Sequence, residues 1–356
     1  MITGKGRCNV TNYCTDVQEL ISNIPTNGRF LYSAFSSFMT YDTMSLFEDL
    51  GVPLKIERGN RVFPVSDKSV DIVDALDRYL RKTKVKTVLA SVKALKLNDE
   101  GSKVCGVEID DGTVLPCDSV VLATGGMSYP ATGSTGDGYK IAAAVGHTVT
   151  ELNPSLVPME SDDDFCRQMQ GLSLKNIAVK ITDSKSSKVI YEDFGEMLFT
   201  HFGVSGPVIL SASSHIRKME KNRYILHVDL KPALTDEQLD ERIQRDFLKF
   251  SNRDFQNSLH ALLPAKMIPV VVERSSIDPQ KKVNQITKAE RYELVTLLKN
   301  FEIRISGFRP ISEAIVTSGG INVKEINPKT MESKLIKDLY FAGEIIDVDA
   351  YTGGFN

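Results

Sequence analysis

The hydrophobic pattern of the chain is organised around a short apolar run at residues 120–122, which a glycine-rich segment follows. The run is typical of a buried strand. Residues 123–138 then contain five glycines, and the alanine-rich residues 139–146 predict a helix. Glycines let a backbone approach a ligand, and a helix N-terminus offers unpaired N–H groups. The order strand, glycine loop, helix therefore favours a site for a phosphate or another electron-rich group, with a ligand-free connection as the alternative.

Upstream of this run, the pattern predicts two helices and then a β-meander. The helices are expected at 42–50 and from Ser66 to about 82, with short strands and turns between them. Short runs of β-branched residues predict the meander strands at 85–90, 91–97, 104–109 and 113–117. Asp111-Gly112 is a strong hairpin signal within this meander.

The pattern changes after residue 147. A hairpin is predicted from 177–182 and 188–192, and a further strand from 224–230. Residues 235–300 read as mainly helical, and Thr235-x-x-Gln238 and Thr287-x-x-Glu290 have the form of capping boxes. The last segment again shows apolar runs that are followed by glycines. Its strand candidates are 311–317 and 338–342, and a glycine-bearing block follows each of them.

Composition narrows the class of protein. The chain has 356 residues, of which 42% are hydrophobic and 25% charged, with a net charge of −3. This balance gives no electrostatic argument for nucleic acid or a membrane as a partner. The five cysteines show no CxxC spacing, and the histidines have no metal-ligand spacing. We therefore expect a cytoplasmic protein without a metal site.

Two features leave alternatives open. Residues 4–12 are polar and glycine-bearing, and they are either a frayed terminus or a ligand-binding block. In the second case Lys5 and Arg7 meet an anionic ligand, and Asn9 and Asn12 fix its polar ring atoms. His201, in a glycine-marked connection, and Tyr129 are candidates for an acid or base. The residues do not decide between them, so no catalytic residue is assigned.

The glycine-bearing blocks taken together resemble one family, the BaiN/YhiN-like bacterial NAD(P)/FAD-dependent oxidoreductases, which are aminoacetone oxidase-like flavoproteins. The blocks that carry the resemblance are residues 3–9, 123–138, 201–207, 317–320 and 341–356. Members of this family begin with a βαβ unit carrying GxGxxG upstream of the first block, and they continue into a helix after the last one. The chain is therefore expected to be a family member truncated at both ends.

The resemblance implies a set of residues that bind FAD. They come from the N-terminal block (residues 4–12), the first meander strand, the central loop (residues 123–138) and the C-terminal block (residues 341–356). These residues are Lys5, Gly6, Arg7, Cys8, Asn9, Val88, Ala123, Thr124, Gly125, Gly126, Gly343, Glu344, Asp347, Gly353, Gly354 and Asn356. Gly353, Gly354 and Asn356 match the turn whose N–H groups face the flavin pyrimidine.

The expected architecture is α/β: a partial FAD-binding dinucleotide (Rossmann-like) domain with a β-meander, interrupted by a β-plus-helical insert. The FAD-binding parts are expected at 1–150 and 310–356, and the insert, which lines the substrate cavity, at 151–309. The implied function is hydride transfer through flavin N5 to or from a small organic substrate, with NAD(P)H as the electron donor. The alternatives are a non-catalytic remnant that does not hold FAD and a flavin-dependent tRNA-modifying protein.

Overall fold

The computed structural model describes residues 6–356, so Lys5 of the predicted site lies outside the described residues. The chain divides into two compact units, Met1–Ser155 with Pro310–Asn356 and Leu156–Arg309. We refer to these as the split unit and the inserted unit. Both combine helices with sheets, and the expected α/β class is confirmed. The assignment of the two units to cofactor and substrate stays a prediction.

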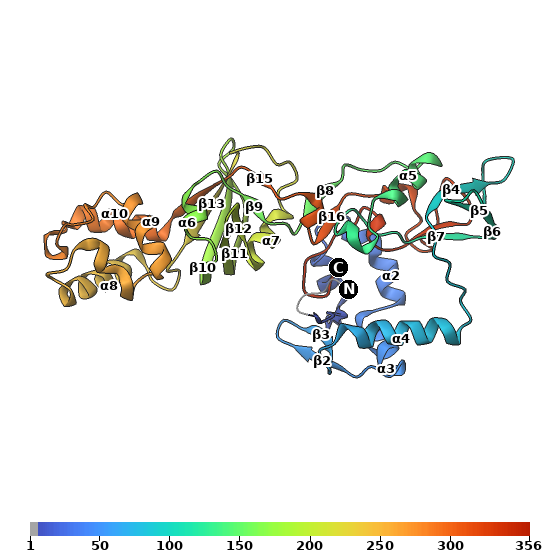
Figure 1. Cartoon of the computed structure of the whole chain (residues 1–356), viewed down its shortest axis with the longest axis horizontal. Helices are drawn as coiled ribbons and strands as arrows, with labels where there is room; N and C mark the ends of the chain where they lie inside the picture. The colour runs from blue at the N-terminus through green and yellow to red at the C-terminus, as the bar shows by residue number, and fades with distance from the viewer. Residues whose placement is uncertain (1–5) are drawn as a thin grey trace. The chain divides into compact units, whose positions relative to one another are not determined.

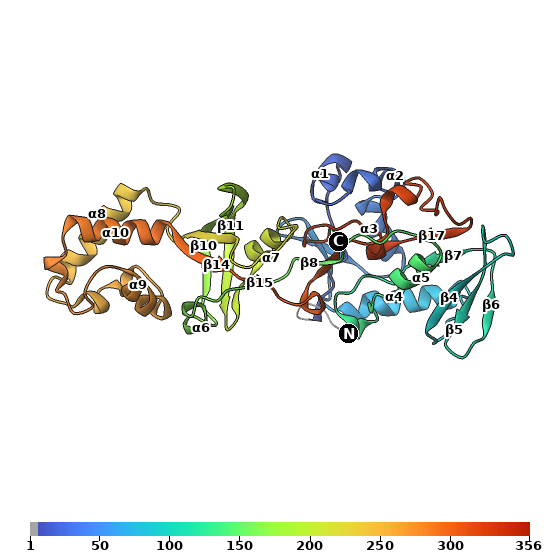
Figure 2. The ribbon, with the colours of Figure 1, turned by 90° about the horizontal axis from the view of Figure 1, so that it is seen from above.

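The split unit contains a pair of parallel strands from distant parts of the sequence, β7 (Val120–Leu122) and β17 (Leu339–Phe341). Leu122 lies opposite Phe341, and the two strands lie next to each other in Figure 2. Both residues belong to a core that also includes Ile141 of helix α5 (Asp137–Ala144) and Leu95 of the meander. The two predicted strands are confirmed, although nothing in their local pattern shows that they pair.

The meander has three strands, one fewer than predicted (Figure 1). They are β4 (Val92–Leu97), β5 (Val104–Ile109) and β6 (Val114–Pro116). The prediction of a strand at 85–90 was wrong, because this stretch forms no ladder with any described strand. Val88 is therefore not part of a meander strand.

The N-terminal part of the split unit holds a small sheet in the order β1-β3-β2 and several helices. The strands are β1 (Thr11–Asn12), β2 (Leu54–Glu57) and β3 (Arg61–Pro64). The helices are α1 (Val17–Ser22), α2 (Tyr32–Ser37), α3 (Thr40–Asp49) and α4 (Ser69–Lys82). Helix α4 begins at Ser69 and is not capped by Ser66, whose hydroxyl donates instead to the Asp71 carboxylate at 2.5 Å.

The last part of the split unit differs from its prediction at one strand. A strand was expected at 311–317, but Pro310 instead begins a 3₁₀ turn at Ile311–Glu313, in which Glu313 N–H donates to the Pro310 carbonyl. Within residues 311–318 a strand forms only at β16 (Val316–Ser318), which pairs with β8 (Asn153–Ser155).

The inserted unit is built on a seven-stranded sheet in the order β14-β13-β10-β11-β12-β9-β15. Its strands are β9 (Met159–Glu160), β10 (Ser173–Asp183), β11 (Lys188–Thr200), β12 (Gly203–Ser205), β13 (Tyr224–Asp229), β14 (Phe301–Ile305) and β15 (Gly307–Phe308). Its helices are α6 (Phe165–Gln168), α7 (Pro207–Ser213), α8 (Asp236–Lys249), α9 (Ile268–Arg274) and α10 (Lys288–Lys299). Both predicted capping boxes are confirmed at the starts of α8 and α10.

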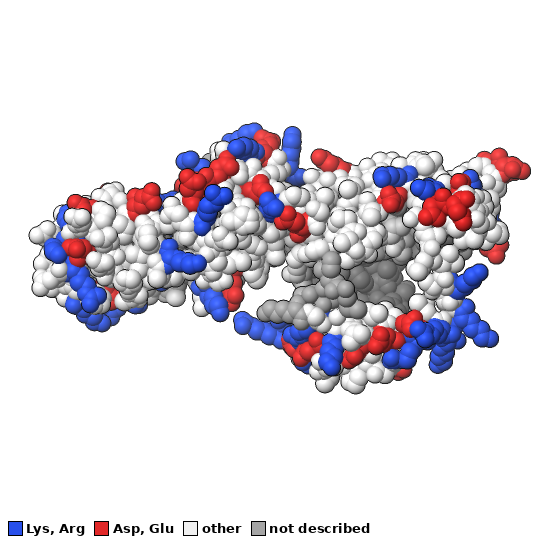
Figure 3. Space-filling view, viewed as in Figure 1, with Lys and Arg blue, Asp and Glu red and all other residues white. Residues whose placement is uncertain are grey.

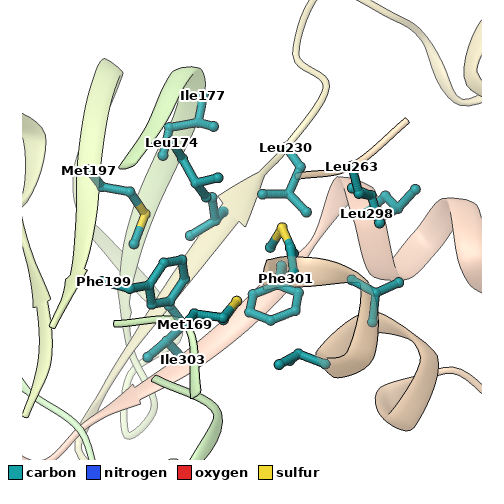
Figure 4. Packing of buried hydrophobic residues seen from close by; sticks show 14 of the residues in the cluster. Met169, Leu174, Ile177, Met197, Phe199, Leu230, Leu263, Leu298, Phe301 and Ile303 are labelled. Carbon is teal, nitrogen blue, oxygen red and sulfur yellow. The ribbon is translucent and has the colours of Figure 1, made fainter. Parts of the chain in front are cut away.

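One hydrophobic core joins the sheet of the inserted unit to its helices. Phe199 on β11, Met169 after α6 and Phe301 on β14 lie together in Figure 4, with Leu298 of α10 on the helical side. These four side chains are fully or almost fully buried. The β-plus-helical segment therefore has its own core.

Candidate functional site

The candidate site of the split unit begins where β7 and β17 end. Because the strands are parallel and in register, the glycine-bearing segments that follow them start at the same edge of the sheet. The Ala342 N–H donates to the Leu122 carbonyl at 3.0 Å, which ties the start of one segment to the end of the other strand. Crevices at the carboxyl ends of parallel strands are the usual ligand sites of α/β sheets. Ala123, Thr124 and Gly343 are all exposed at this edge.

A third segment, strand β16, is hydrogen-bonded to both of the loops that follow β7 and β17. Thr317 Oγ1 accepts hydrogen bonds from the backbone N–H groups of Met127, at 2.8 Å, and Ser128, at 3.1 Å. The Thr317 N–H in turn donates to Glu344 Oε1 at 2.7 Å. Gly126 lies against this junction so closely that a Cβ there would overlap the Thr317 side chain. Glycine at 126 is therefore a packing requirement.

Glu344 is a half-buried carboxyl inside this junction. Burial raises its pKa, although hydrogen bonds from the backbone N–H groups of Thr317 and Gly126 oppose the shift. Nearby, the buried Asp349 accepts hydrogen bonds from Ser155 and Ser318, both at 3.3 Å. The Tyr139 hydroxyl of α5 donates to the Glu344 carbonyl at 3.4 Å. These contacts give the loops fixed positions.

The chain end packs against the N-terminal block. Asn12 Nδ2 donates to the Gly353 carbonyl at 3.0 Å and to the Gly59 carbonyl at 3.1 Å. Gly354 lies against the backbone of Thr11, where a Cβ would overlap main-chain atoms. The two ends of the described chain thus form one structure in the split unit.

A cavity of about 260 Å³ connects the β17 loop with the chain end. Gly343, Glu344 and Asn356 line it together with Phe355 and Phe35. Three residues implied by the family resemblance therefore share one cavity. Asp347 is anchored nearby through its backbone, since its carbonyl accepts from Asn27 Nδ2 at 2.7 Å.

Within residues 6–356, two buried polar atoms of the N-terminal block, Arg7 Nε and Asn9 Oδ1, have no hydrogen-bond partner. The Arg7 guanidinium forms ion pairs with Glu57, at 2.5 Å, and Asp67, at 2.6 Å, and it lies 3.9 Å from the Phe63 ring centroid. Its positive charge is thus already balanced by two carboxylates, which weakens the expectation that Arg7 meets an anion. The unpartnered donor and acceptor instead fit a polar ring edge, as a flavin has.

Other predicted residues lie elsewhere in the split unit. Gly6 is exposed, and burial raises the pKa of the half-buried Cys8 thiol. Val88 lines a separate cavity of about 330 Å³ together with Val92, Leu115 and Cys117. Gly125 has a positive φ of 71° and lies in the loop before Gly126.

The two acid–base candidates differ in their surroundings. Tyr129 is partly exposed in the split unit, within the central loop. His201 is exposed in the inserted unit, where its ring meets Phe202 edge-on with centroids 5.0 Å apart. Sequence reasoning named Asn12 as a residue that fixes polar ring atoms of a ligand, but it missed the contact of Asn12 with the chain end. It also missed Thr317 as a positioning residue, for which the available signal was its place before Ser318-Gly319-Gly320.

Surface charge and metal ligands add little to this site. Over each unit, basic and acidic side chains lie next to one another on the face shown in Figure 3. Among residues 6–356, no group of three His, Cys, Asp or Glu side chains is arranged to hold a metal ion. No helix within the described residues is long and apolar enough to cross a membrane.

Comparison with known proteins identifies a family model and several relatives. The family model described as "HI0933-like protein Rossmann domain" matches residues 1–356. A 3-dehydro-bile acid delta(4,6)-reductase of Clostridium scindens is 30% identical and aligns with 100% of this chain and 85% of its own. A ribosomal RNA dihydrouridine synthase of Haemophilus influenzae is also 30% identical, with the same coverage. Its namesake from Escherichia coli is 28% identical over 100% of this chain and 84% of its own.

Proposed function

Because this chain belongs to the HI0933-like Rossmann-domain family and is an oxidoreductase of that flavoprotein family, we propose that it binds FAD at the carboxyl ends of β7 and β17. We further propose that it reduces a carbon–carbon double bond conjugated to a carbonyl group. The observation that carries this proposal is the parallel pairing of β7 with β17, which brings two glycine-bearing segments to one edge of the sheet. Such an edge is where dinucleotides bind in related sheets.

The residues that would hold the cofactor come from both ends of the chain and from the central loop. We propose that Ala123 to Gly126, with Gly343 and Glu344, lie along the phosphate-bearing part of FAD. The unpartnered Asn9 Oδ1 and Arg7 Nε would bond the polar edge of the ring system. An unpartnered buried polar group is unfavourable by about 1–3 kcal/mol, so such contacts favour the bound state.

The chain's own contribution to the chemistry is to bind, orient and fix donors. A bound flavin supplies hydride transfer through its N5 atom. Asn12 keeps Gly353 at β1, and in this proposal the turn at Gly353 and Gly354 directs backbone N–H groups at the flavin pyrimidine. Fixed donors of this kind stabilise the negative charge that develops during a reaction.

We infer the substrate class from the kind of reaction that the names of two relatives have in common. A delta(4,6)-reductase of a 3-dehydro-bile acid and a dihydrouridine synthase both saturate a carbon–carbon double bond near a carbonyl group. A carbonyl polarises the double bond, so that its far carbon accepts a hydride. We therefore propose a conjugated enone in a small organic molecule as substrate, with NAD(P)H as the electron donor.

A second candidate is the uridine of an RNA. Two relatives named as ribosomal RNA dihydrouridine synthases support it. The net charge of −3 weighs against it, because binding to phosphates usually uses a basic surface. The small-molecule substrate is therefore the first proposal and RNA the second.

The first experiment tests cofactor binding. The purified chain should show flavin absorbance, or a higher melting temperature on addition of FAD. Asn9→Ala should weaken FAD binding about tenfold, as expected for the loss of one hydrogen bond. Asn252→Ala, at an exposed position of the inserted unit, is the control and should bind normally. A melting temperature unchanged at saturating FAD would favour the non-catalytic remnant.

The second experiment separates the substrates. The FAD-loaded chain is supplied with NADH or NADPH and either a 3-oxo-4-ene steroid or a uridine-containing RNA. Loss of the enone absorbance supports the first proposal, and dihydrouridine in digested RNA supports the second. Flavin that is reduced by neither nucleotide would contradict the assignment of NAD(P)H as donor.

A further inference from the structure

Two cysteines face each other across the β-meander. The register pairs Gly106 with Pro116, so that Cys105 and Cys117 are the next residues opposite one another. The Cys117 N–H donates to the Cys105 carbonyl at 3.1 Å, which continues the ladder to this pair. Opposite residues of antiparallel strands point to the same face, with Cα atoms about 4.5–5.5 Å apart. This spacing lies within the range that a disulfide bridges.

The two thiols differ in access. Both are free in the structure, with Cys105 exposed and Cys117 half-buried. Burial raises the pKa of the Cys117 thiol, and the neighbouring Cys105 adds to the shift. Cys105 is therefore the thiol that a reagent in solution meets first. The other three cysteines are buried or half-buried, and Cys14 and Cys166 are almost fully enclosed.

We propose that Cys105 and Cys117 are a redox-responsive pair that forms a reversible disulfide by exchange with a small-molecule disulfide such as glutathione disulfide. The Cys105 thiolate attacks one sulfur of the reagent, which forms a mixed disulfide and releases one glutathione thiolate. The Cys117 thiolate then attacks the Cys105 sulfur, and the second glutathione leaves. The two cysteines lose two protons and two electrons, and the reagent gains both as two thiols.

The bond would close the hairpin around Asp111-Gly112 and hold the end of β6. Only Asp118 and Ser119 separate Cys117 from β7, the strand that leads into the central glycine loop. Cys117 also lines the cavity of about 330 Å³ that contains Val88. Oxidation would therefore restrain the segment that precedes the candidate site.

Mass spectrometry of the full chain tests the proposal. The native protein is incubated with glutathione disulfide, quenched with N-ethylmaleimide and mapped without reduction. We expect a peptide that links Cys105 to Cys117, a loss of two hydrogen masses from the intact chain, and recovery of both thiols with dithiothreitol. Hydrogen exchange of residues 106–116 should slow in the oxidised form.

Single substitutions identify the order of the steps. Cys117→Ser should stop at a stable glutathione adduct on Cys105, whereas Cys105→Ser should give neither the adduct there nor the link. Cys8→Ser is the control and should form the link as the wild type does. The proposal is overturned if the folded wild type carries glutathione on Cys105 without forming the link, or if the link joins other cysteines.

Discussion

Thr317 and Met127 are 190 residues apart in the sequence, yet Thr317 Oγ1 lies 2.8 Å from the Met127 backbone nitrogen. The same oxygen also accepts from the Ser128 N–H, in a buried position. Two backbone donors of the central loop thus depend on one side chain from β16. The loop's conformation is therefore set by a residue from outside it.

Replacement of this oxygen should destabilise the split unit. Thr317→Val keeps the shape of the side chain but leaves both N–H groups without an acceptor, so we expect unfolding to become easier by about 1–3 kcal/mol. Urea denaturation followed by circular dichroism measures the change. Thr317→Ser retains the hydroxyl and is the control. Equal losses in the two variants would mean that the methyl group, and not the hydrogen bonds, holds the loop.

The sequence predicted those parts of the fold that have a local signal. The apolar runs at β7 and β17 and the glycines after them were recognised, as were the capping boxes at Thr235 and Thr287. Pairing could not be predicted in this way, because the register of β7 with β17 depends on side chains more than 200 residues apart. The failure at Val88 has the same cause, since a β-branched run becomes a strand only when a neighbouring strand pairs with it.

The resemblance named the residues of the candidate site but not the contacts between them. The glycines at 126 and 354 were named from the resemblance, and the structure gives each a reason, because both lie in contact with distant atoms. The link from Asn12 to Gly353 was missed, since no local pattern connects residues at opposite ends of a chain. The ion pairs of Arg7 with Glu57 and Asp67 were missed because no local pattern links Arg7 to a carboxylate 50 residues away.

The raised pKa of Glu344 predicts a pH dependence of stability. A carboxyl that binds its proton more tightly in the folded state stabilises the fold below its ordinary pKa of about 4.3. That stabilising contribution is lost as the pH rises through the pKa that Glu344 has in the folded state. A glutamine at this position does not titrate. The unfolding free energy of Glu344→Gln minus that of the wild type should therefore increase as the pH rises from about 4 to 7. Denaturation at several pH values measures this difference.

Glu325 is a control, because its contribution to stability should change with pH in the opposite direction. Burial opposes its ionisation, but hydrogen bonds from Thr148 and His147 hold its pKa below the usual value. Its contribution is therefore present above its ordinary pKa and is lost as the pH falls. The difference between Glu325→Gln and the wild type should therefore decrease as the pH rises toward about 4.3 and stay level above it, where the difference for Glu344→Gln still increases. A difference that changes in the same direction for both variants would refute the assignment at Glu344.

The burial of His147 predicts that the folded protein loses stability in mild acid. Its ring is fully buried, 2.8 Å from Ser333 Oγ and edge-on to Phe341 of β17, and burial lowers its pKa despite the hydrogen bond to Glu325. The unfolded chain therefore binds a proton near pH 6.5 that the folded chain does not yet bind. The unfolding free energy should fall below that pH by up to about 1.4 kcal/mol per unit. His147→Gln should show a shallower slope between pH 7 and 5, and an unchanged slope would exclude His147 as the source.

The turn at the chain end offers a matched pair of glycine substitutions. Gly353 and Gly354 both have positive φ values, 105° and 96°, so alanine at either position is strained by about 1 kcal/mol. Only at 354 would the added Cβ also overlap the backbone of Thr11, whereas at 353 its nearest neighbour is the Phe355 ring at 3.8 Å.

Gly354→Ala should therefore separate the turn from β1 and weaken FAD binding at least tenfold, while Gly353→Ala should weaken it less. Titration of each variant with FAD, followed by flavin fluorescence, measures both values. Because strain is common to the two variants, an equal loss would show that the contact with Thr11 does not position the turn for the cofactor.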